Sequence, residues 1–317
     1  MDFESGLYTN EFRERYPNFT EMLEISSRLN PLQKKRIKQF VTGQKKEYWQ
    51  ASERIFSALS QSFFLNNENK LLSAKAYNRM TMDFLKEQIR FKKTGKYLLS
   101  DASSARVNVY ENPEIMRYYM VGLCMSYFLW PNHHKMYNFF QRFLKTNPEI
   151  IKYLDVAPGH GLFAAEVLSK YLSAEATLVD ISATSLDVSK ELLDCFGVGK
   201  SRYNALQGDF LVTEIGSKNF DLITMGEVLE HVEEPLDFLK RAAELLSKNG
   251  RIFMTTCSNA PAIDHIYHFH NSEEIRDLIR AAGLKIESEE SIPAENIPEK
   301  DCEKELVTVN YCCILKK

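Results

Sequence analysis

Hydrophobic and polar positions divide the chain into two halves with different patterns. Up to about residue 147, apolar residues recur three to four positions apart, as at Ile55, Leu59 and Phe63, and strand-like alternation is scarce. This spacing predicts a series of amphipathic helices. From Ile151 onward, short apolar runs alternate with helical patterns, which is typical of a doubly wound parallel sheet.

The second half contains seven candidate strands. Strands are expected near 151–156, 175–180, 202–207, 220–225, 250–256, 284–292 and 305–315, with helices near 161–172, 183–196, 235–247 and 272–282. Only an irregular segment with prolines separates the last two strands, so they should pair antiparallel. We therefore expect an α/β fold: an all-α N-terminal cap, then a seven-stranded, Rossmann-like doubly wound sheet with a C-terminal antiparallel hairpin.

Length and composition fit an ordinary globular protein of two domains. The chain has 317 residues, which favours a division into a helical domain, 1–147, and a sheet domain, 148–317. No apolar run approaches the roughly 20 residues that span a bilayer, so no membrane partner is expected. The first residues are polar and acidic, unlike a secretory signal, and we expect a cytoplasmic location.

Charge and cysteine content narrow the possible partners. The net charge is −3 and the pI is near 6.2, which argues against a nucleic-acid partner. The six cysteines follow neither a zinc pattern nor a dense disulfide framework, so we expect reduced, mostly buried thiols. A monomer or homodimer is expected.

The first strand of the predicted sheet ends in a glycine loop. Asp155 lies near the end of the strand, and Gly159 and Gly161 follow in the turn into a helix. Glycine lets the backbone approach a ligand closely, and an acid before the loop would attract an amino group and repel a pyrophosphate. Asp180 ends the next strand, where a carboxylate would accept both ribose hydroxyls. Alternatively, Asp155 forms a turn and Asp180 caps the following helix.

This segment resembles the class I S-adenosylmethionine methyltransferases, whose first motif is acid-x-G-x-G-x-G. Here Asp155, Ala157, Gly159 and Gly161 occupy the four motif positions, with alanine in place of the first glycine. We expect that exchange to be mild, because alanine adopts most conformations that are not left-handed. The resemblance implies S-adenosyl-L-methionine as the cofactor, with these four residues around its methionine portion.

Three further segments match the motifs of this family in order. The resemblance implies that Asp180 and Ile181 hold ribose and adenine, and that Gly208, Asp209 and Phe210 contact the adenine. Gly226 and Glu227 follow the fourth strand, and the resemblance implies that they complete the cofactor site. The Glu230-His231 pair that follows is typical of the small-molecule branch of the family.

Histidines after the fourth and fifth strands are candidates for the acceptor side of the site, since ligands bind at the carboxyl ends of the strands. His231 and His265 are predicted catalytic residues: His231 would act as a general base, unless it only bonds to backbone. His231, His265 and His268 are predicted to contact the acceptor. Histidines 265, 268 and 270 with Asp264 form no recognised zinc pattern, and we expect no metal.

Aromatic residues upstream of the glycine loop are also candidates for the acceptor site. Tyr118, Tyr119 and Tyr137 have polar hydroxyls that need partners if they are buried, so they are predicted to reach a crevice, although helical spacing also allows a core position. The helical half would then close over the cofactor and exclude water.

The function predicted from these motifs is methyl transfer from S-adenosyl-L-methionine to an N, O or C atom of a small-molecule acceptor. One alternative keeps the cofactor and changes the reaction to aminopropyl transfer or cyclisation of S-adenosylmethionine. Another is a catalytically silent partner protein. The product distinguishes the first alternative from methyl transfer, because methyl transfer leaves S-adenosylhomocysteine and attack through the aminobutyrate chain leaves methylthioadenosine. A protein that does not bind S-adenosylhomocysteine would support the second alternative.

Overall fold

The computed structural model describes residues 9–61, 67–147 and 149–317. Phe63, one of the helix-pattern residues, and residue 148, at the predicted domain boundary, lie outside this range. In the described part of residues 9–147 all the regular structure is helical, as predicted. Its helices are α1 (Asn10–Arg15), α2 (Pro17–Leu29), α3 (Pro31–Thr42), α4 (Lys46–Leu59), α5 (Asn67–Thr94), α6 (Ala102–Ala105), the π-helical turn η1 (Arg106–Tyr110), α7 (Pro113–Leu129) and α8 (Pro131–Thr146).

Proline and asparagine set the starts of these helices. Asn112 precedes Pro113 at the start of α7, and its side chain accepts hydrogen bonds from the backbone N–H groups of Glu114 and Ile115. Proline fits the first helical position because its fixed φ suits the helix and its missing N–H would be unpaired there. α8 likewise begins at Pro131. α8 packs Phe139 and Phe140 against Phe253 of the sheet.

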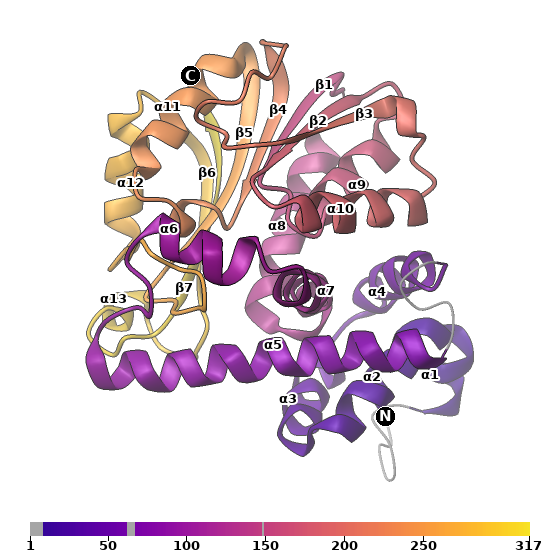
Figure 1. Ribbon diagram of the computed structural model, residues 1–317. Coiled ribbons are helices and arrows are strands. Elements are labelled where there is room, and N and C mark those ends of the chain that lie inside the picture. The colour runs from indigo at the N-terminus through magenta and orange to yellow at the C-terminus, as the bar shows by residue number, and fades with distance from the viewer. Residues whose placement is uncertain (1–8, 62–66, 148) are drawn as a thin grey trace.

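The second half forms one seven-stranded sheet with the order β3-β2-β1-β4-β5-β7-β6 (Figure 1). The strands are β1 (Lys152–Val156), β2 (Glu175–Asp180), β3 (Tyr203–Gln207), β4 (Phe220–Gly226), β5 (Leu246–Ser258), β6 (Lys285–Pro293) and β7 (Val309–Lys316). The first five are parallel, and β7 pairs antiparallel with both β5 and β6. The predicted α/β class, sheet and C-terminal hairpin are confirmed.

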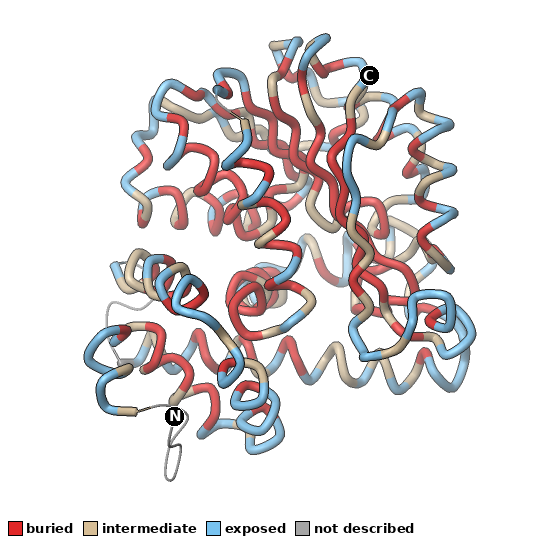
Figure 2. Tube along the Cα trace, turned by 180° about the vertical axis from the view of Figure 1, so that it is seen from behind, coloured by how far each residue is buried: buried red, intermediate tan, exposed pale blue. Residues whose placement is uncertain are grey.

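Helices cover both faces of this sheet. Successive strand residues point to opposite faces, and apolar residues on both faces are buried under helices. The helices of this half are α9 (Leu162–Lys170), α10 (Ala183–Cys195), the short turns η2 (Lys200–Arg202) and η3 (Leu229–His231), α11 (Pro235–Leu245), α12 (Ser272–Ala281) and α13 (Glu299–Cys302). Phe253 of β5 packs with α8 and α9, whereas its neighbour Met254 belongs to the core under α11 and α12. The buried strands run through the centre of the molecule in Figure 2.

The last strand begins later than its apolar pattern predicts. β7 starts at Val309 rather than at 305, because residues 303–306 form a turn in which Leu306 has a left-handed φ of 49°. The pattern at Leu306 and Val307 reflects packing: Val307 is buried against Cys302 of α13. Apolar residues in a buried turn and in a strand look alike in sequence.

The helical half and the sheet share one hydrophobic core. Phe56 of α4 packs on Phe128 of α7, and Phe140 of α8 packs on Phe253 of β5, with ring centroids 5.8 and 4.5 Å apart. The division into domains at residue 147 stays a prediction. Among the described residues no helix is long and apolar enough to cross a membrane. All six cysteines lie in the described part of the chain, where they are buried and form no disulfide, as predicted.

Candidate functional site

A cavity of about 1130 Å³ lies at the carboxyl ends of β1, β2 and β4 and extends to residues of α3, α5 and α7. Pockets that hold one drug-sized ligand measure about 300–1,000 Å³. This cavity is slightly larger than the upper end of that range. Its wall combines the ends of the parallel strands with aromatic side chains from the helical half, which lies against this end of the sheet (Figure 1).

Asp155 ends β1 on the cavity wall with one oxygen unpaired. Its Oδ1 accepts a hydrogen bond of 2.6 Å from the Thr224 hydroxyl on β4, and that hydroxyl lies 2.6 Å from the Tyr153 hydroxyl. Its Oδ2 is buried and has no partner among the described residues. Burial raises the pKa of Asp155 to about 7. A buried, unpaired carboxylate oxygen is costly unless a ligand pairs with it, and a cationic group would do so.

The backbone around Asp155 is held in left-handed conformations. Ala157 has a φ of 54°, Gly159 of 56° and Glu227, at the end of the adjacent β4, of 51°. We expected alanine to replace glycine here at little cost because the position would not be left-handed. That reason is wrong, since Ala157 adopts a left-handed φ, which costs alanine about 1–2 kcal/mol. Residues held in such conformations cluster at ligand sites, where the surrounding structure fixes them.

Gly161 lies behind the loop rather than on the cavity wall. It precedes α9 with a φ of 79°, and an added Cβ would lie 2.8 Å from the Cα of Ser189 in α10. Gly159 does line the cavity, where its Cβ would approach Met120. The two glycines of the motif therefore have different local roles: Gly159 faces the ligand space and Gly161 allows α9 and α10 to pack.

Asp180 ends β2 on the same wall. Its Oδ1 accepts a 2.8 Å hydrogen bond from the Ser182 backbone, while the Ser182 hydroxyl, not Asp180, caps α10. Asp180 therefore does not cap α10, although it shapes the turn between β2 and that helix. Burial raises the pKa of Asp180 to about 6. Ile181 lines the cavity beside it.

The remaining predicted cofactor residues line the cavity as a group: Gly208, Asp209, Phe210, Gly226 and Glu227. Phe210 packs against Phe238 of α11, which holds its ring at the cavity edge. Gly226 leaves space for Phe163, whose ring would lie 2.7 Å from an added Cβ. One oxygen of Glu227 accepts from Asn310 at 3.2 Å, and the other is buried without a partner in the described residues.

His231, on η3, lies beside the cavity in a polar network. Its Nδ1 is 3.0 Å from the Tyr110 hydroxyl, 3.3 Å from the backbone oxygen of Asp264 and 3.4 Å from the Asp264 carboxylate. The Tyr119 hydroxyl donates to the same carboxylate at 3.3 Å. His231 thus makes the backbone contact that the sequence analysis considered, and the Asp264 carboxylate lies where it can orient the imidazole ring.

His265 faces His231 across this corner of the cavity. Their rings meet edge to face with centroids 4.7 Å apart, and the Nδ1 of His265 lies 2.5 Å from the backbone oxygen of Ala260. Burial lowers the pKa of His265 well below its usual value, which keeps the ring neutral. With its proton on Nδ1, the lone pair of Nε2 is free.

Four other side chains predicted for the site, or weighed as metal ligands, lie away from the cavity wall. His268 contacts Asn259 at 2.9 Å, and the exposed His270 pairs with Glu274. The Tyr118 hydroxyl donates to Asp83, and that of Tyr137 donates to Glu166 inside the helical core. Of the three predicted tyrosines, the structure brings only Tyr119 to the cavity.

Sequence reasoning missed two members of the His231 network. Tyr110 ends the π-helical turn η1, 121 positions before its partner, and no local pattern marks it. Asp264 was considered only as a metal ligand, yet it lies beside a predicted site histidine in sequence. Its position directly before His265 was the one feature of the sequence that could have marked Asp264 as a site residue.

Comparisons with known proteins agree with this geometry. A family model described as "Methyltransferase domain" matches residues 131–289. A mitochondrial ubiquinone biosynthesis O-methyltransferase of Schizosaccharomyces pombe is 34% identical over 107 residues, 34% of this chain and 38% of that protein. The enzyme of the same name from Coxiella burnetii is 34% identical over 126 residues, 40% of this chain and 51% of the relative. The chain thus covers about half the length of such relatives.

Solved structures share the fold at low sequence identity. The [4+2]-cyclase SpnF has a TM-score of 0.50 and 14% identity, covering 66% of this chain and 97% of that one. The mitomycin 7-O-methyltransferase MmcR also has a TM-score of 0.50, with 16% identity over 78% of this chain and 71% of its own. These two structures carry different activities on one fold, so the fold alone does not select the reaction.

Proposed function

Because the chain belongs to the methyltransferase domain family, we propose that it transfers the methyl group of S-adenosyl-L-methionine to a hydroxyl oxygen of a small-molecule acceptor. S-adenosyl-L-methionine is the cofactor that this family and the class I fold imply. Oxygen is favoured over nitrogen or carbon because the relatives are named as O-methyltransferases. A cytoplasmic location, a monomeric or homodimeric state and the absence of a nucleic-acid substrate stay predictions from composition.

The observation that carries this proposal is the unpaired, buried Oδ2 of Asp155. It lies on the cavity wall beside the left-handed Ala157 and Gly159, where an ammonium group would pair with it. Asp180 would accept the ribose hydroxyls one strand away, and Phe210 would pack on the adenine. The residues present therefore fit a ligand that carries an amino acid at one end and a nucleoside at the other.

The chemistry needs little beyond alignment and a proton acceptor. The bound cofactor supplies a methyl group on a positively charged sulfur. The acceptor oxygen forms the new bond to that carbon while the carbon–sulfur bond breaks and its electron pair returns to sulfur. We assign His231 as the side chain that takes the hydroxyl proton, because its ring lies at the cavity and the Asp264 carboxylate can hold its orientation.

Aromatic walls in the helical half favour a flat, hydroxylated aromatic acceptor. Phe84 of α5 stacks with Tyr119 of α7 at 6.0 Å and meets Trp130 edge to face at 5.4 Å, and all three line the cavity. Such walls bind ring systems through apolar area and ring stacking. On this proposal the helices before residue 147 form the acceptor-binding cap, and the residues after it hold the cofactor.

The proposed function is tested by the product. The protein is incubated with S-adenosylmethionine labelled in the methyl group and a panel of hydroxylated aromatic compounds, and the mixture is analysed by mass spectrometry. S-adenosylhomocysteine and a labelled methyl ether are expected. Methylthioadenosine in place of S-adenosylhomocysteine would indicate transfer of the aminobutyrate chain, and absence of S-adenosylhomocysteine binding would indicate a silent partner protein.

Asp180→Ala is expected to weaken S-adenosylhomocysteine binding by at least about 100-fold. Two hydrogen bonds from ribose hydroxyls to a carboxylate are worth about 1.5–3 kcal/mol each, and 1.4 kcal/mol is a factor of ten. Isothermal titration calorimetry measures the change. Asp187→Ala removes an exposed carboxylate from α10 and should bind like the wild type. If Asp180→Ala also binds like the wild type, the carboxylate only shapes the turn to Ser182.

Affinity for S-adenosylhomocysteine should fall as the pH drops from about 7 to about 6, approaching tenfold per unit. Burial raises the pKa of Asp155 to about 7, so below that pH the free protein is mostly protonated there and must lose a proton to pair with the ligand ammonium. Above about pH 7 the affinity should level off. Asp155→Asn should bind weakly and keep only the smaller pH dependence that comes from Asp180, whose pKa burial raises to about 6; a pH dependence equal to the wild type would contradict the assignment.

A further inference from the structure

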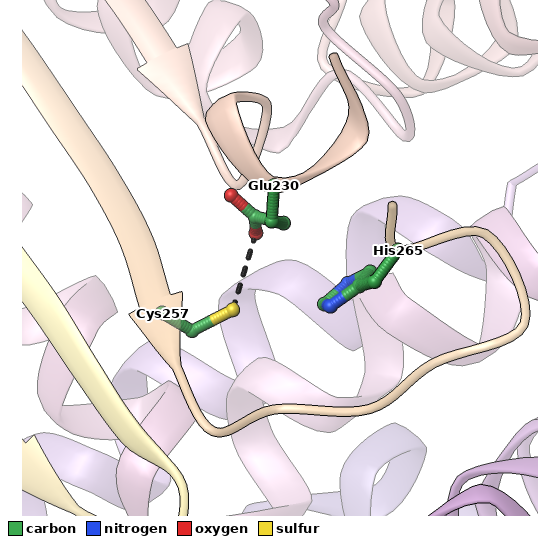
Figure 3. Close-up of side chains that lie close together, drawn as sticks. All are labelled: Glu230, Cys257 and His265. Atoms are coloured by element: carbon green, nitrogen blue, oxygen red, sulfur yellow. Dashed lines mark hydrogen bonds between the residues drawn. The ribbon is translucent and has the colours of Figure 1, made fainter. Parts of the chain in front are cut away.

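Glu230, Cys257 and His265 converge at one corner of the cavity (Figure 3). Glu230 comes from η3, 27 positions before Cys257 at the end of β5, and His265 from the segment that directly follows β5. All three are buried, and one ligand atom from each, a carboxylate oxygen, a thiol sulfur and an imidazole nitrogen, lies within 4.8 Å of the others. Cys257 and His265 also line the cavity, which gives access from solvent.

Hydrogen bonds hold each side chain of this cluster in place, and both oxygens of Glu230 accept one. The Thr256 hydroxyl donates to one oxygen of Glu230 at 2.7 Å, and the Cys257 thiol donates to the other at 3.4 Å. The Nδ1 of His265 is fixed on the Ala260 carbonyl, which directs the lone pair of Nε2 inward. Histidines that bind metals in proteins have this arrangement, with one nitrogen on a carbonyl or carboxylate and the other on the metal.

Carboxylates gather at this corner without a fixed positive charge. Glu230 and Asp264 are buried, and one oxygen of Glu227 is buried with no partner among the described residues. His231 lies 3.4 Å from the Asp264 carboxylate and is charged only when protonated. In the described part of the chain no lysine or arginine forms an ion pair with any of these three carboxylates. A bound cation would stabilise their ionised forms.

We propose that Glu230, Cys257 and His265 form a binding site for a divalent transition-metal ion, with zinc the best match. Zinc binds thiolate, imidazole and carboxylate ligands, whereas magnesium and calcium do not favour sulfur. In tetrahedral geometry, ligand atoms at about 2.0–2.3 Å from zinc lie about 3.3–3.8 Å apart. The Cys257 sulfur and a Glu230 oxygen are already 3.4 Å apart, so a side-chain shift of about 1 Å by His265 completes the site. On binding, the Cys257 thiol releases its proton to solvent and becomes the thiolate ligand.

Three protein ligands leave a fourth coordination position open. Here it faces the cavity beside His231, whose ring contacts His265. Sites with an open position bind a substrate or water there, in contrast to four-ligand structural sites. If the proposed function holds, the acceptor oxygen is the group that binds there. The site itself does not depend on that function. The sequence analysis predicted no metal because it weighed His265 with His268, His270 and Asp264, whose spacing is no recognised zinc pattern; Glu230 and Cys257 were not considered with them.

Cobalt(II) is the probe that tests this site, because it replaces zinc and reports its ligands. Protein stripped with a chelator is titrated with cobalt chloride, then with zinc chloride. We expect one equivalent of cobalt, a thiolate-to-cobalt charge-transfer band in the near ultraviolet, and loss of that band on adding zinc. Cys257→Ser should abolish the band. Thr256→Val, which removes the hydroxyl that orients Glu230, should weaken metal binding about 10–100-fold.

Cys302→Ser is the matched control, because Cys302 is also buried and its thiol also donates to an oxygen, the backbone oxygen of Pro298 just before α13. It should keep the band. Absence of stoichiometric cobalt binding overturns the proposal, and so does binding without the band, which would place the ion on His231, Asp264 and His265. X-ray absorption of the zinc-loaded wild type requires no variant: one sulfur ligand is expected, and none or two would contradict the site. Neither result alters the product test of methyl transfer.

Discussion

His231→Gln is expected to lower kcat by about 10²–10⁴-fold, the usual contribution of a positioned proton acceptor. Glutamine retains size and polarity but does not take a proton near neutral pH. Nδ1 of His231 lies within reach of the backbone oxygen and carboxylate of Asp264, which favours a proton on Nδ1 and leaves Nε2 to accept one from the acceptor hydroxyl. The rate is measured by S-adenosylhomocysteine release with the acceptor that the product screen identifies.

The separation of kcat from binding makes this test specific. His231 is on the acceptor side of the cavity, so the affinity for S-adenosylhomocysteine should stay within about threefold of the wild type. His270→Gln changes an exposed histidine outside the cavity and should leave both quantities unchanged. Wild-type kcat in His231→Gln would remove this residue from the reaction, and an equal loss of cofactor affinity would assign it a structural role.

The sheet could be predicted from sequence because two different periodicities alternate along it. Buried parallel strands are short apolar runs, and the helices between them are amphipathic, so β1, β2 and β4 were located to within a residue or two. The antiparallel pairing of β6 with β7 was predicted because only an irregular segment with prolines joins them. The start of β7 could not be predicted from the pattern, because apolar residues of a buried turn precede the strand.

The cofactor side of the cavity was predictable for a topological reason. Parallel strands end at one edge of the sheet, so acids at the ends of β1 and β2 must lie near each other. The structure brings Asp155 and Asp180 to one wall as expected. The conformation of Ala157 was not predictable, since a left-handed φ depends on the surrounding packing and not on the alanine itself.

The acceptor side was less predictable because separate segments build it. Tyr110, His231 and Asp264 meet from three parts of the chain, and no spacing in sequence links them. The tyrosines of the helical half illustrate the same limit. Most of α7 is buried, so helical periodicity does not say which buried face meets the cavity: Tyr119 does, whereas Tyr118 turns to Asp83 on α5.

The glycine loop contains one glycine that faces the ligand space, Gly159, and one that allows two helices to pack, Gly161. A motif match assigns both to the cofactor. The structure places Gly161 against Ser189 of α10, where even a methyl group meets backbone and side-chain atoms at 2.8–3.0 Å. The distinction has a measurable consequence, because a packing glycine acts on stability and a ligand glycine acts on affinity.

Gly161→Ala is expected to lower the free energy of unfolding by about 2–5 kcal/mol. About 1–2 kcal/mol comes from alanine at a left-handed φ, and about 1–3 kcal/mol from forcing α9 and α10 apart. Gly197→Ala is the matched control: its φ of 69° is similar, but its Cβ would meet nothing within 4 Å, so it should lose only the first contribution. Urea unfolding measures both. If Gly161→Ala were as stable as Gly197→Ala and bound S-adenosylhomocysteine more weakly, Gly161 would belong to the cofactor site, as the motif implies.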